Sequence, residues 1–239
     1  MQFDKKGNNP LLAIGFLFKG FKLLVRPELR KFVVIPLLIN VVLYSVALVL
    51  GYFYISDLIG HFITDRLAWL SWVLWPLFFI SFFIAAFFTF TVLANILAAP
   101  FYGTLSAKTL AMVSDKAYAT AEQPLAKVLV AQLKRMGYLA GRALPLLVLS
   151  FVPGVNVLAP FLWLLFGAWS MALEYLAYPL ENQGVLFAEQ KKLVKSVRLG
   201  ALSFGGVVVL GSSIPVLNII VAPAAVIGAT LYFDGIGWD

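Results

Sequence analysis

One short basic segment, Arg26–Lys31, combines the residue types that bind an oxyanion, and it directly precedes a long apolar run. Pro27 suits the first position of a helix, where a residue needs no acceptor for its amide. The three amide N–H groups that follow would then lack intrahelical acceptors at the positive end of the helix dipole. Together with the side chains of Arg30 and Lys31, they predict an anion site. The alternative is that these basic residues only anchor a helix at a membrane surface.

Two asparagines, Asn156 and Asn218, mark a second candidate pathway for an anion. Each lies in an uncharged apolar run three residues after a proline, in a shared pattern of Pro-x-x-Asn followed by Ala-Pro. Proline breaks a helix, and asparagine is a favourable N-cap for the next one. Transporters use such broken helices to bind anions inside the membrane. The alternative is a turn that only packs against its neighbours.

The residues needed for catalysis or metal binding are nearly absent. His61 is the only histidine, there is no cysteine, and the eleven carboxylates are scattered along the chain. No glycine-rich phosphate loop of the G-x-x-x-x-G-K-[ST] type occurs. We therefore expect no enzyme, no catalytic residues, no metal, no cofactor and no hydrolysis of ATP by this chain.

The composition predicts an integral membrane protein. Of the 239 residues, 62% are hydrophobic and 12% charged, and the mean hydropathy is +0.95. A soluble chain of this length could not bury so much apolar surface. These values exclude a cytosolic globular enzyme, a disordered regulator and a disulfide-linked secreted module. We expect a single membrane domain over residues 1–239.

Four stretches without charged residues define the expected membrane elements: 32–56, 67–107, 143–173 and 199–233. About 20 apolar residues cross a bilayer as a helix, so 32–56 and 67–94 are expected to be transmembrane helices. The last two stretches are interrupted by proline and glycine, and each piece before the break is too short to cross. We interpret 143–173 and 199–233 as re-entrant helical hairpins. The alternative is a bundle of four kinked spans.

Basic residues indicate the orientation. Seven of them lie within residues 1–31, one within 57–66, six within 108–142 and four within 174–198. The positive-inside rule then places 1–31 in the cytoplasm or its interface and 57–66 outside. A hairpin at 143–173 keeps the basic segment 174–198 inside. No charge pattern settles the last stretch.

The basic segments 11–26, 125–136 and 186–198 are amphipathic, so we expect interfacial helices on anionic membrane lipid. The predicted fold class is an all-α integral membrane protein. It has two long transmembrane helices, two partly inserted hairpins and interfacial amphipathic helices.

Several separate motifs occur along the chain: Pro27-x-x-Arg30-Lys31-Phe32, Asn95-x-x-Ala98-Ala99-Pro100-Phe101, Phe151-Val152-Pro153-Gly154, Tyr175-x-x-Tyr178-Pro179-x-x-Asn182 and Ile214-Pro215-x-x-Asn218. With these motifs in this order, the chain resembles the CysZ sulfate permease family from about residue 15 to 233. The resemblance implies a bacterial inner-membrane protein that takes up sulfate for cysteine synthesis. It also implies two long helices with two partly inserted hairpins, no associated ATPase, no nucleic-acid partner, and homo-oligomers such as a hexamer whose protomers occur in both orientations.

The same resemblance implies a sulfate site in the segment where the family has a Gly-Leu/Ile-Arg-Arg-like motif. In this chain the matching residues are Glu28, Leu29, Arg30 and Lys31. Glu28 replaces the expected glycine, and its carboxylate would repel sulfate unless it points away. Lys31 replaces a second arginine, which keeps the charge but loses the bidentate fork.

Two rival functions remain beside an ATP-independent sulfate permease or channel. One is a channel for another anion in the same scaffold. The other is a membrane-interface scaffold or accessory subunit that conducts nothing, which the amphipathic helices and half-inserted hairpins would also suit. A membrane enzyme ranks behind both, because no acid–base set is found.

Overall fold

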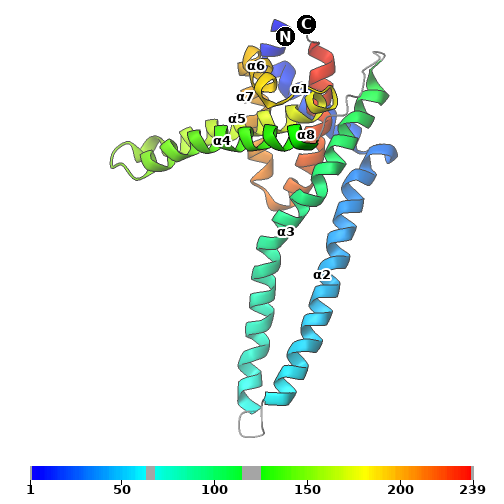
Figure 1. The fold of residues 1–239 in the computed structure, drawn as a ribbon, viewed down its shortest axis with the longest axis vertical. Helices are drawn as coiled ribbons and strands as arrows, with labels where there is room; N and C mark the ends of the chain where they lie inside the picture. Colours follow the sequence, from blue (N-terminus) through cyan, green and yellow to red (C-terminus); the bar gives the residue numbers. More distant parts are fainter. Residues whose placement is uncertain (1, 63–67, 115–124, 238–239) are drawn as a thin grey trace. The chain divides into compact units, whose positions relative to one another are not determined.

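The computed structural model describes residues 2–62, 68–114 and 125–237, and these ranges form a mainly α-helical protein (Figure 1). This confirms the predicted all-α class. The elements are η1 (Lys5–Asn8), α1 (Pro10–Leu24), α2 (Pro27–Phe62), α3 (Ala68–Val113), α4 (Leu125–Ser150), η3 (Asn156–Leu158), α5 (Ala159–Asn182), α6 (Phe187–Ser196), α7 (Arg198–Ser212) and α8 (Pro215–Ile236).

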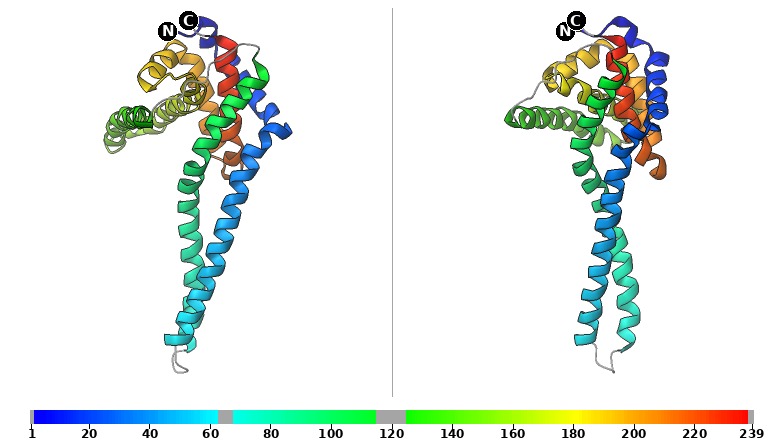
Figure 2. Two further views of the ribbon diagram at one scale, coloured as in Figure 1. Left: turned by 45° about the vertical axis from the view of Figure 1, so that its right-hand side comes forward. Right: turned by 90° about the vertical axis from the view of Figure 1, so that its right-hand side faces the viewer.

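The chain divides into two compact units, one formed by residues 33–100 and the other by residues 1–32 with 101–239. In the first unit, the long limbs of α2 and α3 run side by side (Figures 1 and 2). Tyr52 stacks on Trp75 with ring centroids 4.9 Å apart, and the Tyr44 and Thr89 hydroxyls lie 3.0 Å apart. Between such contacts the limbs expose apolar side chains, as expected of surfaces that face lipid.

Both long helices extend beyond the expected crossings 32–56 and 67–94. The third helix continues through Asn95–Pro100, so the motif Asn95-x-x-Ala98-Ala99-Pro100 lies inside a helix and does not interrupt it. The expected external segment 57–66 lies partly outside the described residues. By length and composition, four helices in the described ranges could cross a membrane: Pro27–His61, Trp69–Ala86, Asn156–Asn182 and Leu217–Ile236.

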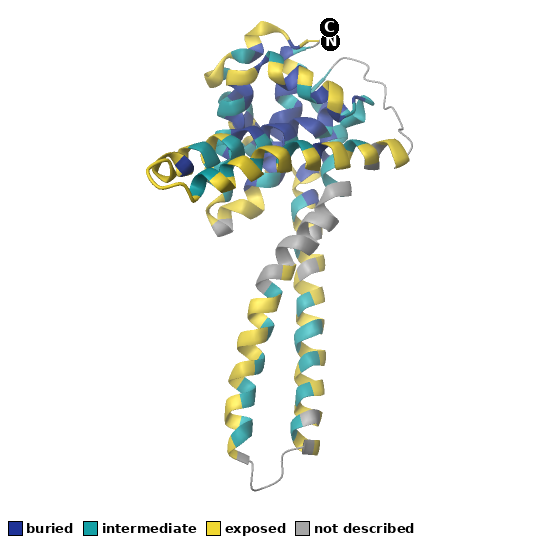
Figure 3. Ribbon diagram, turned by 60° about the vertical axis from the view of Figure 1, so that its left-hand side comes forward, coloured by how far each residue is buried: buried dark blue, intermediate teal, exposed yellow. Residues whose placement is uncertain are grey.

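Helices α1, α5, α7 and α8 form the core of the second unit, which appears dark blue in Figure 3. Asn9 caps the start of α1, and its side-chain oxygen accepts hydrogen bonds from the amides of Leu11 and Leu12. Its buried Gly20 lies so close to α8 that an added Cβ would collide with the backbone at Ala224 and Gly228. Small residues allow helices to approach this closely. Thus one face of α1 belongs to the core of this unit. The interfacial position that the sequence predicts for this helix stays a prediction.

The two predicted helix breaks occur where proline and glycine interrupt the apolar runs. One separates α4 from α5 around Pro153 and Gly154, which has a positive φ of 83°. The other separates α7 from α8 at Ile214, the residue before Pro215. Each stretch is therefore a helical hairpin. Its re-entrant insertion into a bilayer, like the four-span alternative, stays a prediction.

The first limb of the earlier hairpin is longer than the expected piece 143–152. The fourth helix begins at Leu125 and contains Pro145 within its length, so a single proline there does not end it. The predicted amphipathic segment 125–136 and the first hairpin limb are therefore one continuous helix.

Candidate anion-binding site

The α2 helix begins at Pro27, as the sequence predicts. The side chain of Leu29 has no exposed surface and that of Phe32 is nearly buried, so these two residues fix the start of the helix in the core. Glu28, Arg30 and Lys31 remain exposed on the same turn. Packing of Leu29 thus presents three charged side chains to the surroundings.

The expectation of three free amides in this turn is wrong for two of them. The amides of Leu29 and Arg30 both donate to the carbonyl of Arg26, at 3.0 Å each. The Arg26 carbonyl acts as the cap acceptor, because the chain already turns into the helix at that residue. Within the described residues only the Glu28 amide of the three lacks a backbone acceptor. An anion here would therefore depend more on side chains than the sequence suggested.

The structure adds a basic residue that the sequence analysis did not select, Lys108 near the end of α3. The Lys31 ammonium lies within hydrogen-bonding reach and lowers the pKa of Lys108, while the Glu28 carboxylate acts in the opposite direction. Two ammonium groups this close repel each other, and an anion bound between them would relieve the repulsion. The only sequence signal for Lys108 was its place as the first charge after a long apolar run.

The two asparagines take other roles than the predicted caps. Asn156 lies within the 3-10 turn η3, and α5 begins three residues later without a side-chain cap. Asn218 lies inside α8, because Pro215 already starts that helix. Both side chains are exposed. The α4–α5 turn and the α7–α8 turn lie apart in Figures 1 and 2, so the structure does not bring these asparagines together.

A buried ionic network in the same unit was also missed. Arg135 of α4 is 5% exposed and pairs with Glu174 and Glu181 of α5 at 3.4 and 3.1 Å. Its guanidinium also donates to the Gln190 side chain of α6 at 2.9 Å. This network joins α4 to α5 and α6. From the sequence, Arg135 belongs to the basic amphipathic segment 125–136, whose charges are expected to contact anionic lipid.

Comparison with known proteins gives a consistent result over nearly the whole chain. The family model described as "Sulfate transporter CysZ/Etoposide-induced protein 2.4" matches residues 16–223. A sulfate transporter CysZ of Pseudomonas aeruginosa (strain PAO1) is 39% identical over 229 residues, covering 91% of this chain and 92% of the relative.

Two further relatives carry the same printed name. The sulfate transporter CysZ of Pseudomonas syringae pv. tomato is 40% identical over 227 residues, covering 91% of this chain and 90% of the relative. That of Salmonella enteritidis PT4 is 34% identical over 236 residues, covering 92% and 91%. The similarity therefore spans both compact units.

Proposed function

This chain belongs to the family of the sulfate transporter CysZ, and from that premise we propose that it takes up sulfate across a bacterial membrane. The observation that carries the proposal is the match to sulfate transporters over both units. The family description names a transporter and no enzyme. The apolar helices fit a multi-pass membrane protein.

The sulfate is bound at the start of α2, by Arg30 and Lys31 with the Glu28 amide. Lys108 is a further side-chain ligand, because its ammonium lies beside that of Lys31. Sulfate carries two negative charges, which suits a pair of cations better than a single one. The Glu28 carboxylate lowers the affinity unless it turns away from the bound anion.

The membrane, the assembly and the role in metabolism that we propose rest on the resemblance to the family. We place the protein in the inner membrane as a homo-oligomer surrounded by lipid, supplying sulfate for cysteine synthesis. Two crossing helices and two re-entrant hairpins form each protomer. Asn156 lies in the turn between α4 and α5, and Asn218 lies in the first turn of α8. Transport needs no ATP, since the sequence has no phosphate loop.

Uptake of radiolabelled sulfate into liposomes that contain only this protein tests the function. We expect sulfate to accumulate without nucleotide, above the level in empty liposomes. Sulfate binding without flux would favour the accessory or scaffold role. Equal suppression of uptake by chloride and by unlabelled sulfate would favour a channel for other anions. Uptake only after addition of ATP would contradict the ATP-independent mechanism.

Calorimetric titration with sulfate tests the site. Arg30→Ala should weaken binding roughly ten- to a hundredfold, the usual effect of losing a charged hydrogen bond. Arg30→Lys should recover part of the affinity, because the charge remains without the planar fork. Glu28→Gly should bind as well as the wild type or better. If all three variants bind like the wild type, the basic residues only anchor the helix.

A further inference from the structure

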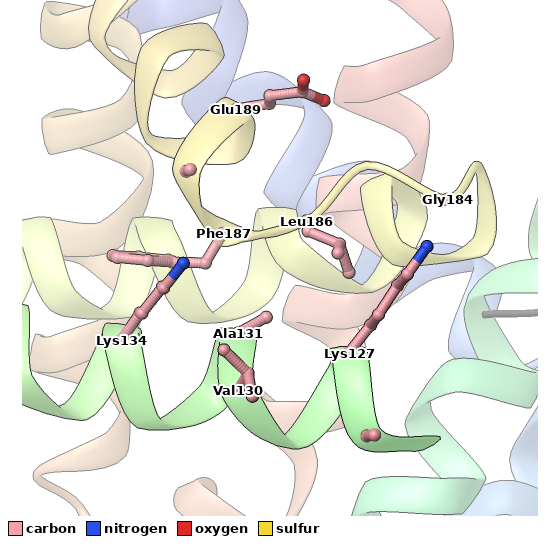
Figure 4. Close-up of a pocket in the computed structure, with 10 residues that line it drawn as sticks. Lys127, Val130, Ala131, Lys134, Gly184, Leu186, Phe187 and Glu189 are labelled. Carbon is pink, nitrogen blue, oxygen red and sulfur yellow. The ribbon is translucent and has the colours of Figure 1, made fainter. Parts of the chain in front are cut away.

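A pocket of about 610 Å³ lies between α4 and the segment that joins α5 to α6 (Figure 4). It is separate from the α2 segment, with which it shares no lining residue. The lining residues are mostly small or apolar: Ala126, Lys127, Val130, Ala131, Lys134, Gly184, Leu186, Phe187, Ala188 and Glu189. The volume falls within the range of small-molecule sites.

Two lysines give the pocket its charge. Lys127 and Lys134 are seven residues apart, hence on one face of α4. Figure 4 shows both side chains extending from α4 toward the turn that carries Gly184 and Phe187. Glu189 is the one carboxylate of the lining, and its head lies apart from both ammonium groups in Figure 4. In the described part of the chain neither lysine has an ion-pair partner, so the pocket carries a net positive charge.

The apolar walls distinguish this pocket from a site for a small inorganic anion. Sulfate or phosphate needs hydrogen-bond donors on most sides and gains nothing from contact with Val130, Leu186 or Phe187. A phospholipid has both parts, a charged phosphate and an apolar glycerol–acyl region. The exposed apolar side chains of Leu133 and Met136, 67% and 66% exposed, lie close along α4 and suit the acyl chains.

We propose that this pocket binds the headgroup of an acidic phospholipid, with Lys127 and Lys134 holding the phosphate and the apolar walls holding the glycerol region. Basic pockets beside membrane helices recognise lipid headgroups in this way. The bound lipid would join α4 to the segment between α5 and α6, and its binding would be independent of sulfate binding.

Native mass spectrometry of the detergent-purified full-length protein, titrated with phosphatidylglycerol or phosphatidylcholine, tests the proposal. The wild type should retain phosphatidylglycerol in preference to phosphatidylcholine. The double variant Lys127→Gln/Lys134→Gln should lose about tenfold or more in phosphatidylglycerol affinity. The matched control Lys192→Gln/Lys195→Gln removes the same charge from α6 outside the pocket and should bind like the wild type. An equal loss in the control would mean that overall charge, not the pocket, attracts the lipid.

A second variant separates volume from charge. Ala188→Trp fills the pocket and keeps both lysines, and it should also lose phosphatidylglycerol. Unchanged binding in this variant or in the double lysine variant overturns the proposal. Displacement of phosphatidylglycerol by millimolar inorganic phosphate would show a free-anion site instead. Circular dichroism and sulfate titration of each variant should match the wild type, which separates a failure here from a failure of the sulfate proposal.

Discussion

Replacement of Lys108 by methionine tests the contribution of α3 to the sulfate site. The substitution keeps most of the side-chain length and removes the ammonium group that lies beside Lys31. Loss of a hydrogen bond from a charged group usually weakens binding strongly, but the loss is smaller where solvent screens the charge. We therefore expect Lys108→Met to bind sulfate roughly five- to tenfold more weakly at neutral pH.

The lowered pKa of Lys108 adds a pH dependence with a defined sign. Lys108 loses its proton at a lower pH than a free lysine, so sulfate affinity should fall as the pH rises through that lowered pKa. Bound sulfate favours the protonated form, so binding should take up protons in this range. In Lys31→Met the neighbouring charge is gone, and the fall in affinity should move to higher pH.

The stability of the sulfate-free protein should have the opposite dependence on pH. The folded-state pKa of Lys108 is lowered, so between it and the unfolded value the unfolded chain binds more protons. The contribution of Lys108 to stability should therefore rise with pH in that window. As the pH rises through this window, the difference in unfolding temperature between the wild type and Lys108→Met should therefore become smaller.

Calorimetry at neutral and alkaline pH, in buffers of different ionisation enthalpy, measures both affinity and proton uptake. Lys195→Met is the control, because it removes an exposed lysine of α6 that belongs to neither proposed site. Wild-type affinity in Lys108→Met, or an equal loss in the control, would refute the assignment of Lys108 to the sulfate site.

Two further predictions concern the fold. Arg135→Met should lower the free energy of unfolding by about 2–3 kcal/mol, because it leaves two carboxylates without their ion-pair partner but these carboxylates are only partly buried. The control Arg142→Met, which removes an exposed arginine that lies over the Tyr138 ring, should lower it by less than about 1 kcal/mol. Denaturant titration in detergent measures both values, and equal effects would contradict a structural role for the Arg135 network. Cysteines at Ala111 and Lys195 should react with an impermeant thiol reagent from the same side of the membrane as each other if 143–173 is a hairpin. Reaction of the two cysteines from opposite sides would contradict the hairpin and support a crossing, and reaction of both from both sides would show protomers in both orientations.

The fold class and the helix breaks could be predicted because both depend on local sequence. Long apolar runs specify membrane helices, and the Pro153-Gly154 and Ile214-Pro215 sequences interrupt two of these runs. The cap positions could not be predicted as reliably. At Asn218 the proline three residues earlier already begins the helix, which leaves the asparagine inside it.

The candidate anion site was predicted in part for a similar reason. Pro27 marks the start of α2 locally, so the charged turn was recognised from sequence alone. Lys108 could not be assigned to it, because only the fold brings residue 108 beside residue 31. The capping of two amides by the Arg26 carbonyl depends on how tightly the chain turns after α1, which no residue pattern specifies.

The fourth helix shows how one basic segment can divide into two environments. Lys134 and Arg135 are adjacent, but one residue rotates a side chain by about 100° around a helix. Because of this rotation, Lys134 lines the pocket between α4 and the segment that joins α5 to α6, whereas Arg135 is buried against Glu174 and Glu181. The partners of Arg135 lie 39 and 46 residues away along the chain. A local sequence pattern cannot show them, so from the sequence Arg135 is grouped with the lysines that are expected to contact lipid. Because the buried arginine joins α4 to α5 and α6, we expect that it also keeps Lys127 and Lys134 of the same helix in place at the pocket.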